Sequence, residues 1–319
     1  MQIRPYSINL QLDALALLES SDSTPRSKQT WDNNCLTAVM AYHDGQAVGI
    51  IPLEPRKLKI SSHAYVNGLW VSGAHVQQSL RSQGVGASMD DAIQGLFPLA
   101  GAVFAYRHDS TSRATKWYLN QGYKILCPIT ALKIDVSPGI TKPTASVIDN
   151  RIDLNRKSEE MMRLFEENLG DFGGYPMRHN TFWVHHWDNN YYRQVYKFLL
   201  LIIEDKSKLL AYAFVGQTNY RDGINRLDIL ECICPPSSTL LRPLIEATIE
   251  SARQRNLSEV RIQCATNDPM TEQFKALGFT ERWITNILGK PLQPGHFADK
   301  LHRDPVPFLD WRHFQLDYI

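Results

Sequence analysis

The sequence has little of what marks several classes of protein. Its 319 residues carry 34 basic and 33 acidic side chains, a net charge of +1, and so lack the basic excess of a dedicated nucleic-acid binder. No apolar run reaches the roughly 20 residues of a membrane-spanning helix, and the run Phe198–Ile203 fits a buried strand. The first residues show no apolar core of a signal peptide. We therefore expect a cytoplasmic protein with neither nucleic acid nor membrane as partner.

Cysteine is also scarce, and no two cysteines form a C-x-x-C pair. An odd number without such pairs is typical of reduced residues in a core rather than of a disulfide framework or a zinc site. We expect no bound metal. The five are Cys35, Cys127, Cys232, Cys234 and Cys264.

The chain is long enough for two domains, and its apolar content of 43% allows each of them a core. Helical and strand patterns alternate along it. Thr37–Tyr42 and Ala47–Leu53 predict a hairpin around the Asp44–Gly45 turn. The stretch Val136–Asn150 contains two prolines and a glycine with few apolar residues, which favours a linker near the middle of the chain.

One stretch organises this interpretation. Leu69–Val76 reads as a strand, interrupted by a Ser72–Gly73 pair that indicates a bulge or a splay. A basic, glycine-bearing turn, Arg81–Gly86, follows, and apolar residues at helical spacing then run to Phe97. Amides at a helix N-terminus lack partners inside the helix and carry partial positive charge, so this order of elements is typical of a phosphate site.

The turn reads R-x-x-G-x-G and resembles the acetyl-coenzyme A pyrophosphate loop of the GNAT superfamily of N-acetyltransferases. A Rossmann or P-loop site fits less well, because there is neither G-x-G-x-x-G nor a lysine after the glycines. A plain glycine turn with a surface arginine is the remaining alternative. The resemblance implies acetyl-coenzyme A as co-substrate and a set of cofactor-binding residues. They are Ala74, His75, Val76, Arg81, Ser82, Gln83, Gly84, Val85, Gly86, Ala87 and Arg113.

A second segment strengthens the resemblance. A short predicted helix carries Trp117–Tyr118 and ends at Gly122–Tyr123, as does the segment that closes the cofactor site in the GNAT superfamily. The resemblance makes Tyr118 the general acid that protonates the departing thiolate. The alternative is that Tyr118 hydrogen-bonds the cofactor sulfur or packs in the core. The strand before the loop carries no carboxylate, so we name no general base; His63, His75, Asp228, Glu231, the carboxylate of Ile319 and a water relay all stay open.

The second half repeats the order of elements, with Gly278–Phe279 lying 156 residues (278 minus 122) after Gly122–Tyr123. This duplication resembles tandem GNAT proteins. We expect an α/β (α+β) fold of two tandem GNAT-like domains, each a mixed, mostly antiparallel sheet flanked by helices. The expected boundaries are a catalytic domain at 1–135, a linker at 136–150, a degenerate GNAT-like domain at 151–290 and a tail at 291–319 that docks on the body.

The two halves differ at the loop. The second half has Cys234-Pro-Pro-Ser-Ser-Thr-Leu240, in which the prolines have no N–H and no glycine allows close approach. We predict that this half binds no coenzyme A. The aromatic segment Asp171–Tyr192 either lines an acceptor pocket or packs in the core, and its adjacent histidines suit a metal poorly because neighbouring helical residues point apart.

These features predict an acyl-coenzyme A-dependent N-acyltransferase that moves acetyl to a primary amine of a small molecule or peptide. The oligomeric state and the acceptor are not fixed by the sequence. One alternative is a non-catalytic coenzyme A-binding or interaction protein, suggested by the missing carboxylate. Another is a FemABX-like aminoacyl transferase, although its RNA substrate needs a basic groove that the net charge does not indicate.

Overall fold

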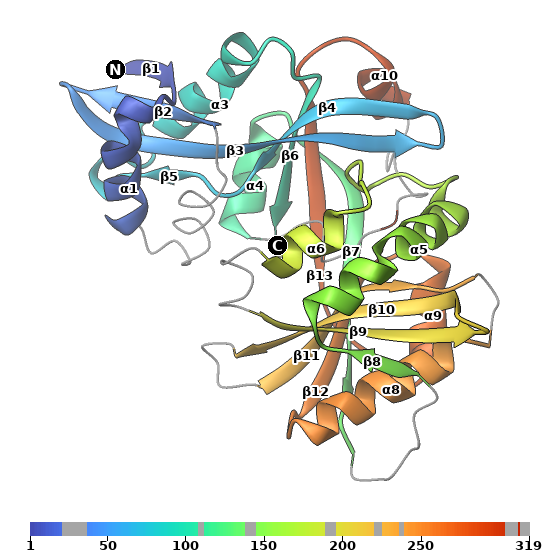
Figure 1. The fold of residues 1–319 in the computed structure, drawn as a ribbon. Coiled ribbons are helices and arrows are strands. Elements are labelled where there is room, and N and C mark those ends of the chain that lie inside the picture. Colours follow the sequence, from blue (N-terminus) through green and yellow to red (C-terminus); the bar gives the residue numbers. More distant parts are fainter. Residues whose placement is uncertain are drawn as a thin grey trace. The chain divides into compact units, whose positions relative to one another are not determined.

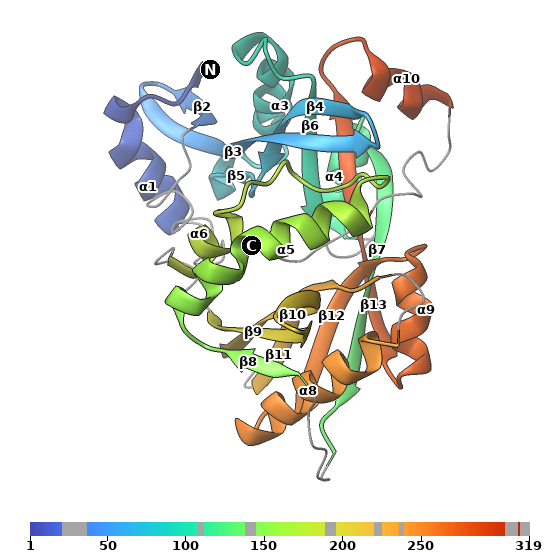
Figure 2. The ribbon, with the colours of Figure 1, turned by 45° about the vertical axis from the view of Figure 1, so that its right-hand side comes forward.

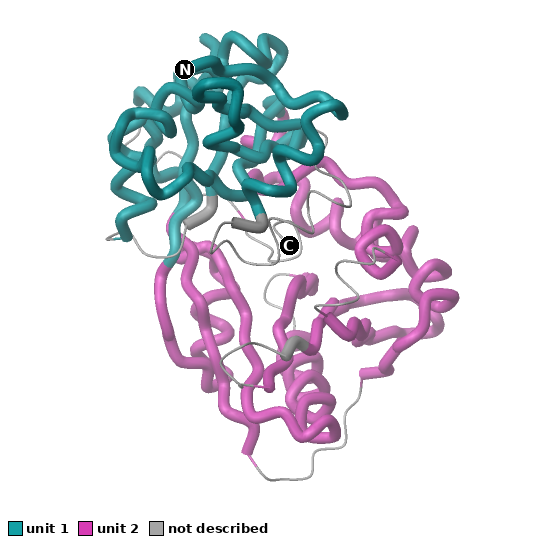
Figure 3. Tube along the Cα trace, turned by 90° about the vertical axis from the view of Figure 1, so that its left-hand side faces the viewer, with its two compact units in different colours: residues 1–58, 64–127, 285–309 teal, residues 59–63, 128–284, 310–319 magenta. Residues whose placement is uncertain are grey.

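The computed structural model describes residues 1–20, 37–107, 112–137, 145–188, 196–219, 225–235, 239–303 and 312. Cys35 lies outside these residues. The chain forms two compact units (Figure 3). Unit 1 comprises residues 1–58, 64–127 and 285–309, and unit 2 comprises residues 59–63, 128–284 and 310–319.

The sheet of unit 1 has the strand order β1-β2-β3-β4-β6-β13, with a short strand β5 beside β3 (Figure 1). The pairing of β4 with β6 is parallel, and those of β1 with β2, β2 with β3, β3 with β5 and β6 with β13 are antiparallel. Asp44 and Gly45 both have positive φ in the turn between β2 and β3, which confirms the predicted hairpin. The strands are β1 Gln2–Pro5, β2 Thr37–His43, β3 Gln46–Ser61, β4 Ala64–Val71, β5 His75–Val76, β6 Ala102–Arg107 and the end of β13 Thr280–Pro291.

The helices of unit 1 are α1 Gln11–Ser20, α3 Val85–Leu96, α4 Arg113–Asn120 and α10 His296–Arg303. Helix α3 buries Val85, Met89 and Ile93, which lie one turn apart, in a core shared with the strands. Helix α10 lies within the predicted tail. Its Phe297 packs edge-on against Phe104 of β6, with ring centroids 5.3 Å apart.

The sheet of unit 2 has the order β7-β12-β11-β10-β9-β8, in which the β11–β12 pairing is parallel and the others are antiparallel. Strand β8 lies inside the stretch expected to be linker. Strand β7 runs without interruption through Pro128. The strands are β7 Lys124–Asp135, β8 Ser146–Ile148, β9 Tyr196–Asp205, β10 Lys208–Asn219, β11 Asn225–Ile233 and β12 Glu259–Ala265.

Helices cover both faces of this second sheet (Figure 2). Leu199 and Leu201 of β9 belong to the core that includes α8, whereas Leu200 and Ile202 belong to the core that includes α5 and α6. Burial on both faces explains the continuous apolar run Phe198–Ile203, as predicted. The helices are α5 Arg151–Leu169, α6 Phe182–Asp188, α8 Leu241–Gln254 and α9 Pro269–Ala276.

Each unit takes a strand from the opposite half of the sequence. In unit 1, Asn286–Pro291 of β13 pair with β6, and in unit 2, Ile129–Asp135 of β7 pair with β12. The duplication expected from the sequence is therefore present, but its final strands are exchanged. The expected domains were continuous segments with boundaries at 135 and 290, whereas each compact unit combines three separate segments of the chain.

Candidate functional site

Two parallel strands part in unit 1 at the place where the sequence predicts a splay. Strands β4 and β6 pair in register from Gly68↔Ala102 to Val71↔Ala105. Beyond Val71 the chain bends through Gly73, whose φ is +153°, and then joins β3 as strand β5. The interruption at Ser72–Gly73 therefore releases one strand from its parallel neighbour.

Strand β5 presents one backbone edge to β3 and the opposite edge away from it. The N–H of Gln77 donates to the carbonyl of Val48 at 2.9 Å. Successive N–H groups of a strand point to opposite edges, so the N–H of Val76 faces away from β3. The carbonyl of Val76 faces the same way and accepts a hydrogen bond from Arg81 Nε at 3.0 Å. Among the expected cofactor-binding residues Ala74–Val76, Val76 has an N–H that is directed away from β3 and can donate to a bound group. His75 is buried and pairs with Ile50.

The loop that follows ends in a glycine with a left-handed backbone. Gly84 is the N-cap of α3 with φ +83°, and a Cβ placed there would meet nothing within 4 Å. No side chain caps this helix. The amides of Val85–Ala87 lie in the first turn of α3, where backbone N–H groups have no partner inside the helix and can bind an anion. Arg81, Ser82 and Gln83 are exposed beside them.

Gly86, one of the expected cofactor-binding residues, also has a packing reason to be small. A Cβ at this position would lie 3.3 Å from Cζ2 of Trp117 on α4. Its missing side chain therefore makes room for an indole. The loop glycine and the aromatic helix are therefore packed together, which joins the two segments that carried the resemblance. Arg113 is the exposed first residue of α4, after its N-cap Ser112.

Tyr118 lies in a cluster of aromatic rings that meet edge to face. Its ring meets Trp117 edge-on at 4.7 Å and Tyr123 edge-on at 4.8 Å between centroids. Only 2% of its surface is exposed. Its orientation is therefore fixed by two neighbours, which suits a group that must deliver a proton at a set position.

The neighbour Tyr123 is held by a buried carboxylate. Its hydroxyl donates to Asp90 Oδ1 at 2.7 Å, and Lys290 Nζ donates to Asp90 Oδ2 at 2.8 Å. Asp90 is 2% exposed, on the inner face of α3. Sequence reasoning missed this arrangement because Lys290 is 200 residues away along the chain and reaches Asp90 only through the exchange of β13.

We expect Asp90→Asn to lower the free energy of unfolding by about 1–3 kcal/mol, because the amide leaves the Lys290 ammonium without its buried counter-charge. The neighbouring substitution Asp91→Asn is the matched control. The Asp91 side chain is 74% exposed, so its effect should stay within about 0.5 kcal/mol. Urea denaturation of both variants checks this, and equal effects would contradict the assigned role of Asp90.

Unit 2 repeats this framework in detail. Strands β11 and β12 also pair over four positions, Arg226↔Glu259 to Ile229↔Ile262. The N–H of Phe279 donates to the carbonyl of Phe274 at 3.1 Å, as the N–H of Tyr123 donates to that of Tyr118 at 3.1 Å. Phe274 thus stands where unit 1 has Tyr118, and it has no hydroxyl. Pro235 follows β11 where unit 1 has its glycine loop.

Glu231, a candidate base, is fully occupied by other groups. It forms a buried ion pair with Arg178, and its Oε1 accepts hydrogen bonds from Trp183 Nε1 and the hydroxyl of Tyr212, each at 2.7 Å. Burial, followed by the charge of Glu231, raises the pKa of Tyr212 well above its ordinary value. Both carboxylate oxygens therefore have structural partners, which removes Glu231 from the candidate bases.

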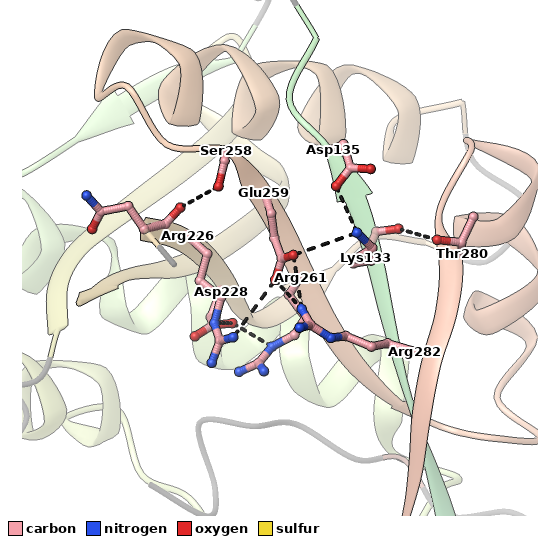
Figure 4. Close-up of polar contacts among 10 residues, drawn as sticks. Lys133, Asp135, Arg226, Asp228, Ser258, Glu259, Arg261, Thr280 and Arg282 are labelled. Carbon is pink, nitrogen blue, oxygen red and sulfur yellow. Dashed lines mark hydrogen bonds and ion pairs between the residues drawn. The ribbon is translucent and has the colours of Figure 1, made fainter. Parts of the chain in front are cut away.

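Asp228 belongs to a ladder of charged side chains across four strands of unit 2 (Figure 4). Arg261 Nε donates to its Oδ1 at 2.8 Å, and Arg226 lies 3.4 Å from the same oxygen. Glu259, the second carboxylate of the ladder, accepts from Arg282 at 2.9 Å. Burial raises the pKa of Asp228 while the two guanidinium groups oppose that shift. The geometry assigns Asp228 to the sheet framework rather than to proton transfer. Ile319 lies outside the described residues, and His63 is exposed in a turn of unit 2.

The aromatic segment from Asp171 packs in the core of unit 2 where it is described. Trp183 is fully buried among Phe165 and Tyr212, and His186 is bonded to the carbonyl of Phe182 at 2.9 Å. Tyr191 and Tyr192 lie outside the described residues. Core packing is therefore observed for Trp183 and His186, whereas Phe172 of the same segment lines a cavity of unit 2. Within the described ranges, no three His, Cys, Asp or Glu side chains form a metal-binding group, and no helix has the length and apolarity to cross a membrane.

Comparison with solved structures shows the fold. A GCN5-related N-acetyltransferase from Anabaena variabilis superposes with a TM-score of 0.66 at 15% identity, covering 92% of this chain and 73% of that one. A probable N-acyltransferase from Enterococcus faecalis gives 0.68 at 9% identity, over 92% and 72%. A tandem GNAT protein from the clavulanic acid biosynthesis pathway gives 0.58 at 14% identity, over 92% and 99%. No family model matches the sequence, and no curated protein matches it. The chain therefore has the GNAT fold in tandem.

Proposed function

We propose that this tandem GNAT fold is an acyl-coenzyme A-dependent N-acyltransferase, with acetyl-coenzyme A as donor and a primary amine of a small molecule or peptide as acceptor. The observation that carries the proposal is the parting of β4 and β6 next to the uncapped, glycine-ended N-terminus of α3. The acyltransferase fold of the solved neighbours supports it.

The loop of unit 1 fits a diphosphate. The amides of Val85, Gly86 and Ala87 lie in the first turn of α3, at the positive end of the helix, and the open space at Gly84 lets phosphate oxygens approach. Arg81 uses its Nε on Val76. Its two terminal nitrogens are then oriented for a second partner, and a guanidinium binds phosphate through two parallel hydrogen bonds.

Two further groups complete the chemistry of acyl transfer, in which a bound thioester supplies the acyl group. The N–H of Val76 faces away from β3 and is positioned to donate to the oxyanion that develops on the acyl carbon. The hydroxyl of Tyr118 is assigned to protonate the departing thiolate. The carboxylates of Glu231 and Asp228 already have structural partners, so we assign no side chain as general base. We propose that a water held by backbone carbonyls deprotonates the amine.

We further propose that unit 2 binds no coenzyme A. Pro235 has no N–H to offer a phosphate, and Phe274 has no proton to give a thiolate. We propose a structural role for unit 2. Cys127, Cys232, Cys234 and Cys264 are buried thiols, which suits a reducing compartment, and we propose that the enzyme lies in the cytoplasm.

Release of free thiol from acetyl-coenzyme A tests the proposal. The full chain is incubated with acetyl-coenzyme A and a panel of primary amines, and thiol is followed with a chromogenic disulfide. Amine-dependent release that requires the folded protein is expected. Tight coenzyme A binding without release for any amine would favour the non-catalytic alternative, and absence of binding would remove both. Aminoacylation from charged tRNA without any coenzyme A binding would favour the FemABX-like alternative.

A further inference from the structure

Unit 2 contains a cavity of about 180 Å³ where β11 and β12 part. The paired register of these strands ends at Ile229↔Ile262, and the cavity is lined by the residues that follow on each strand, by α9 and by the end of α5. A register shift opposite Leu230 marks a bulge in β11 at the same point. The cavity therefore occupies in unit 2 the position that the proposed donor site occupies in unit 1.

The size and the missing groups of this cavity exclude a role like that of unit 1. The cavity has no counterpart of the glycine loop that ends at Gly84 or of the hydroxyl of Tyr118. An apolar protein cavity of ~150 Å³ is large enough for benzene. A volume of 180 Å³ therefore fits a molecule of one aromatic ring with a small substituent.

The charged side chains in the wall already neutralise one another. Glu231 is paired with Arg178, and Arg312 forms a buried ion pair with Asp268. Asp268 also accepts the N–H of Met270 at 2.7 Å as the N-cap of α9. A charged ligand would lose its water without gaining a free counter-charge, which is costly in a buried site. The wall therefore favours a neutral molecule.

Apart from these paired charges and the amides of Asn168, Gln263 and Gln273, the wall is apolar, with aromatic and sulfur-bearing side chains. Phe172, Phe274 and Met270 line it together with three thiols, Cys232, Cys234 and Cys264. Burial raises the pKa of Cys264 to about 12, and the side-chain hydrogen bond with Cys234 followed by burial raises that of Cys232. The thiols of Cys232 and Cys264 are therefore neutral at physiological pH. Neutral sulfur and ring edges make favourable contacts with an aromatic ring.

One donor in the wall lacks a partner. Arg312 is 7% exposed, its guanidinium lies over the ring of Phe172, and its Nε has no hydrogen-bond partner among the residues that the structure describes. A buried N–H left unpaired costs free energy, so a ligand oxygen that accepts from it would be selected. The backbone of Arg312 is fixed by donation to the carbonyl of Gly173 at 2.9 Å.

We propose that this cavity of unit 2 is a second ligand site, for a neutral molecule of one aromatic ring that carries one hydrogen-bond acceptor. The site is independent of the acyltransferase activity proposed for unit 1. Its ligand is recognised by volume, by sulfur and ring contacts and by the single N–H of Arg312, and not by charge.

Acetophenone is the probe, and benzoate, nearly the same in shape but anionic, is its matched control. The full chain is labelled with [13C-methyl]methionine and titrated with each. Acetophenone should shift the Met270 resonance by the ring current and leave that of Met89, in the core of unit 1, in place. Benzoate should bind at least ~10-fold more weakly.

A cavity-filling pair of variants gives a second readout. Cys264→Leu should weaken acetophenone binding at least ~10-fold, whereas Cys127→Leu, at a buried thiol of unit 1, should not change it. If Cys264→Leu does not fold, the wild-type titration decides. An unmoved Met270 resonance at saturating acetophenone, equal shifts at Met270 and Met89, or equal affinity for benzoate would each overturn the proposal.

Discussion

Replacing Gly84 with proline is expected to raise the dissociation constant for coenzyme A at least ~100-fold, a loss of about 2.7 kcal/mol of binding free energy. The φ of +83° at this residue is outside the range of proline, whose ring holds φ near −65°. The loop must therefore rebuild, and the amides of Val85–Ala87 lose their common direction. Isothermal titration of the full chain with coenzyme A measures the change.

The matched control is Gly45→Pro, in the β2–β3 turn. Gly45 has a φ of +80° and nothing within 4 Å of its Cβ position, so the backbone strain is closely similar. This variant should lose stability and keep coenzyme A affinity. Arg81→Glu should also abolish binding, whereas Arg156→Glu on the exposed face of α5 should not. Unchanged affinity in both Gly84→Pro and Arg81→Glu would refute the site.

Replacing Tyr118 with phenylalanine is expected to lower kcat by ~10²–10⁴-fold, the range that a positioned general acid contributes. The ring contacts with Trp117 and Tyr123 survive the substitution, so the dissociation constant of coenzyme A should change less than about threefold. Steady-state kinetics with the amine identified in the thiol-release assay, together with titration of coenzyme A, separate the two quantities.

Tyr123→Phe is the control for this prediction. Its hydroxyl donates to Asp90 rather than to substrate, so its removal should cost stability and leave kcat within about tenfold. A Tyr118→Phe enzyme with wild-type kcat would assign Tyr118 to packing alone. The same loss of kcat in both variants would show that the hydroxyl of Tyr118 has no special part in proton transfer.

Local signals in the sequence predicted much of the fold. A strand, a glycine-bearing turn and a helix leave their pattern within about 30 consecutive residues, so the stretch from Leu69 to Phe97 was readable without a structure. The helix ends at Gly122 and Gly278 were equally local, and both glycines have the left-handed φ that such an end requires. The run Phe198–Ile203 identified a strand buried on both faces.

The long-range features left no such pattern. The exchange of β7 and β13 is a choice of partner strand, and either partner would suit the same apolar residues. The ion pair between Lys290 and Asp90 depends on that exchange, so the sequence did not indicate it either. Arg312 gave no signal either, because a single arginine in an aromatic tail reads as exposed until its partner Asp268 is known.

The role of Gly86 shows how the same residue satisfied two explanations. The motif assigned its small size to a phosphate, whereas the structure assigns it to Trp117, 3.3 Å from the missing Cβ. Both explanations require glycine, so the sequence could not separate them. The packing of α4 on the start of α3 adds the second explanation, which the motif alone does not contain.

The most direct test of the account is a crystal structure of the full chain with coenzyme A. Diphosphate density is expected against the amides of Val85–Ala87, with Arg81 turned toward it, and no cofactor density is expected beside Pro235. Density at Pro235, or an empty loop at Gly84 in a crystal that holds the cofactor elsewhere, would contradict it.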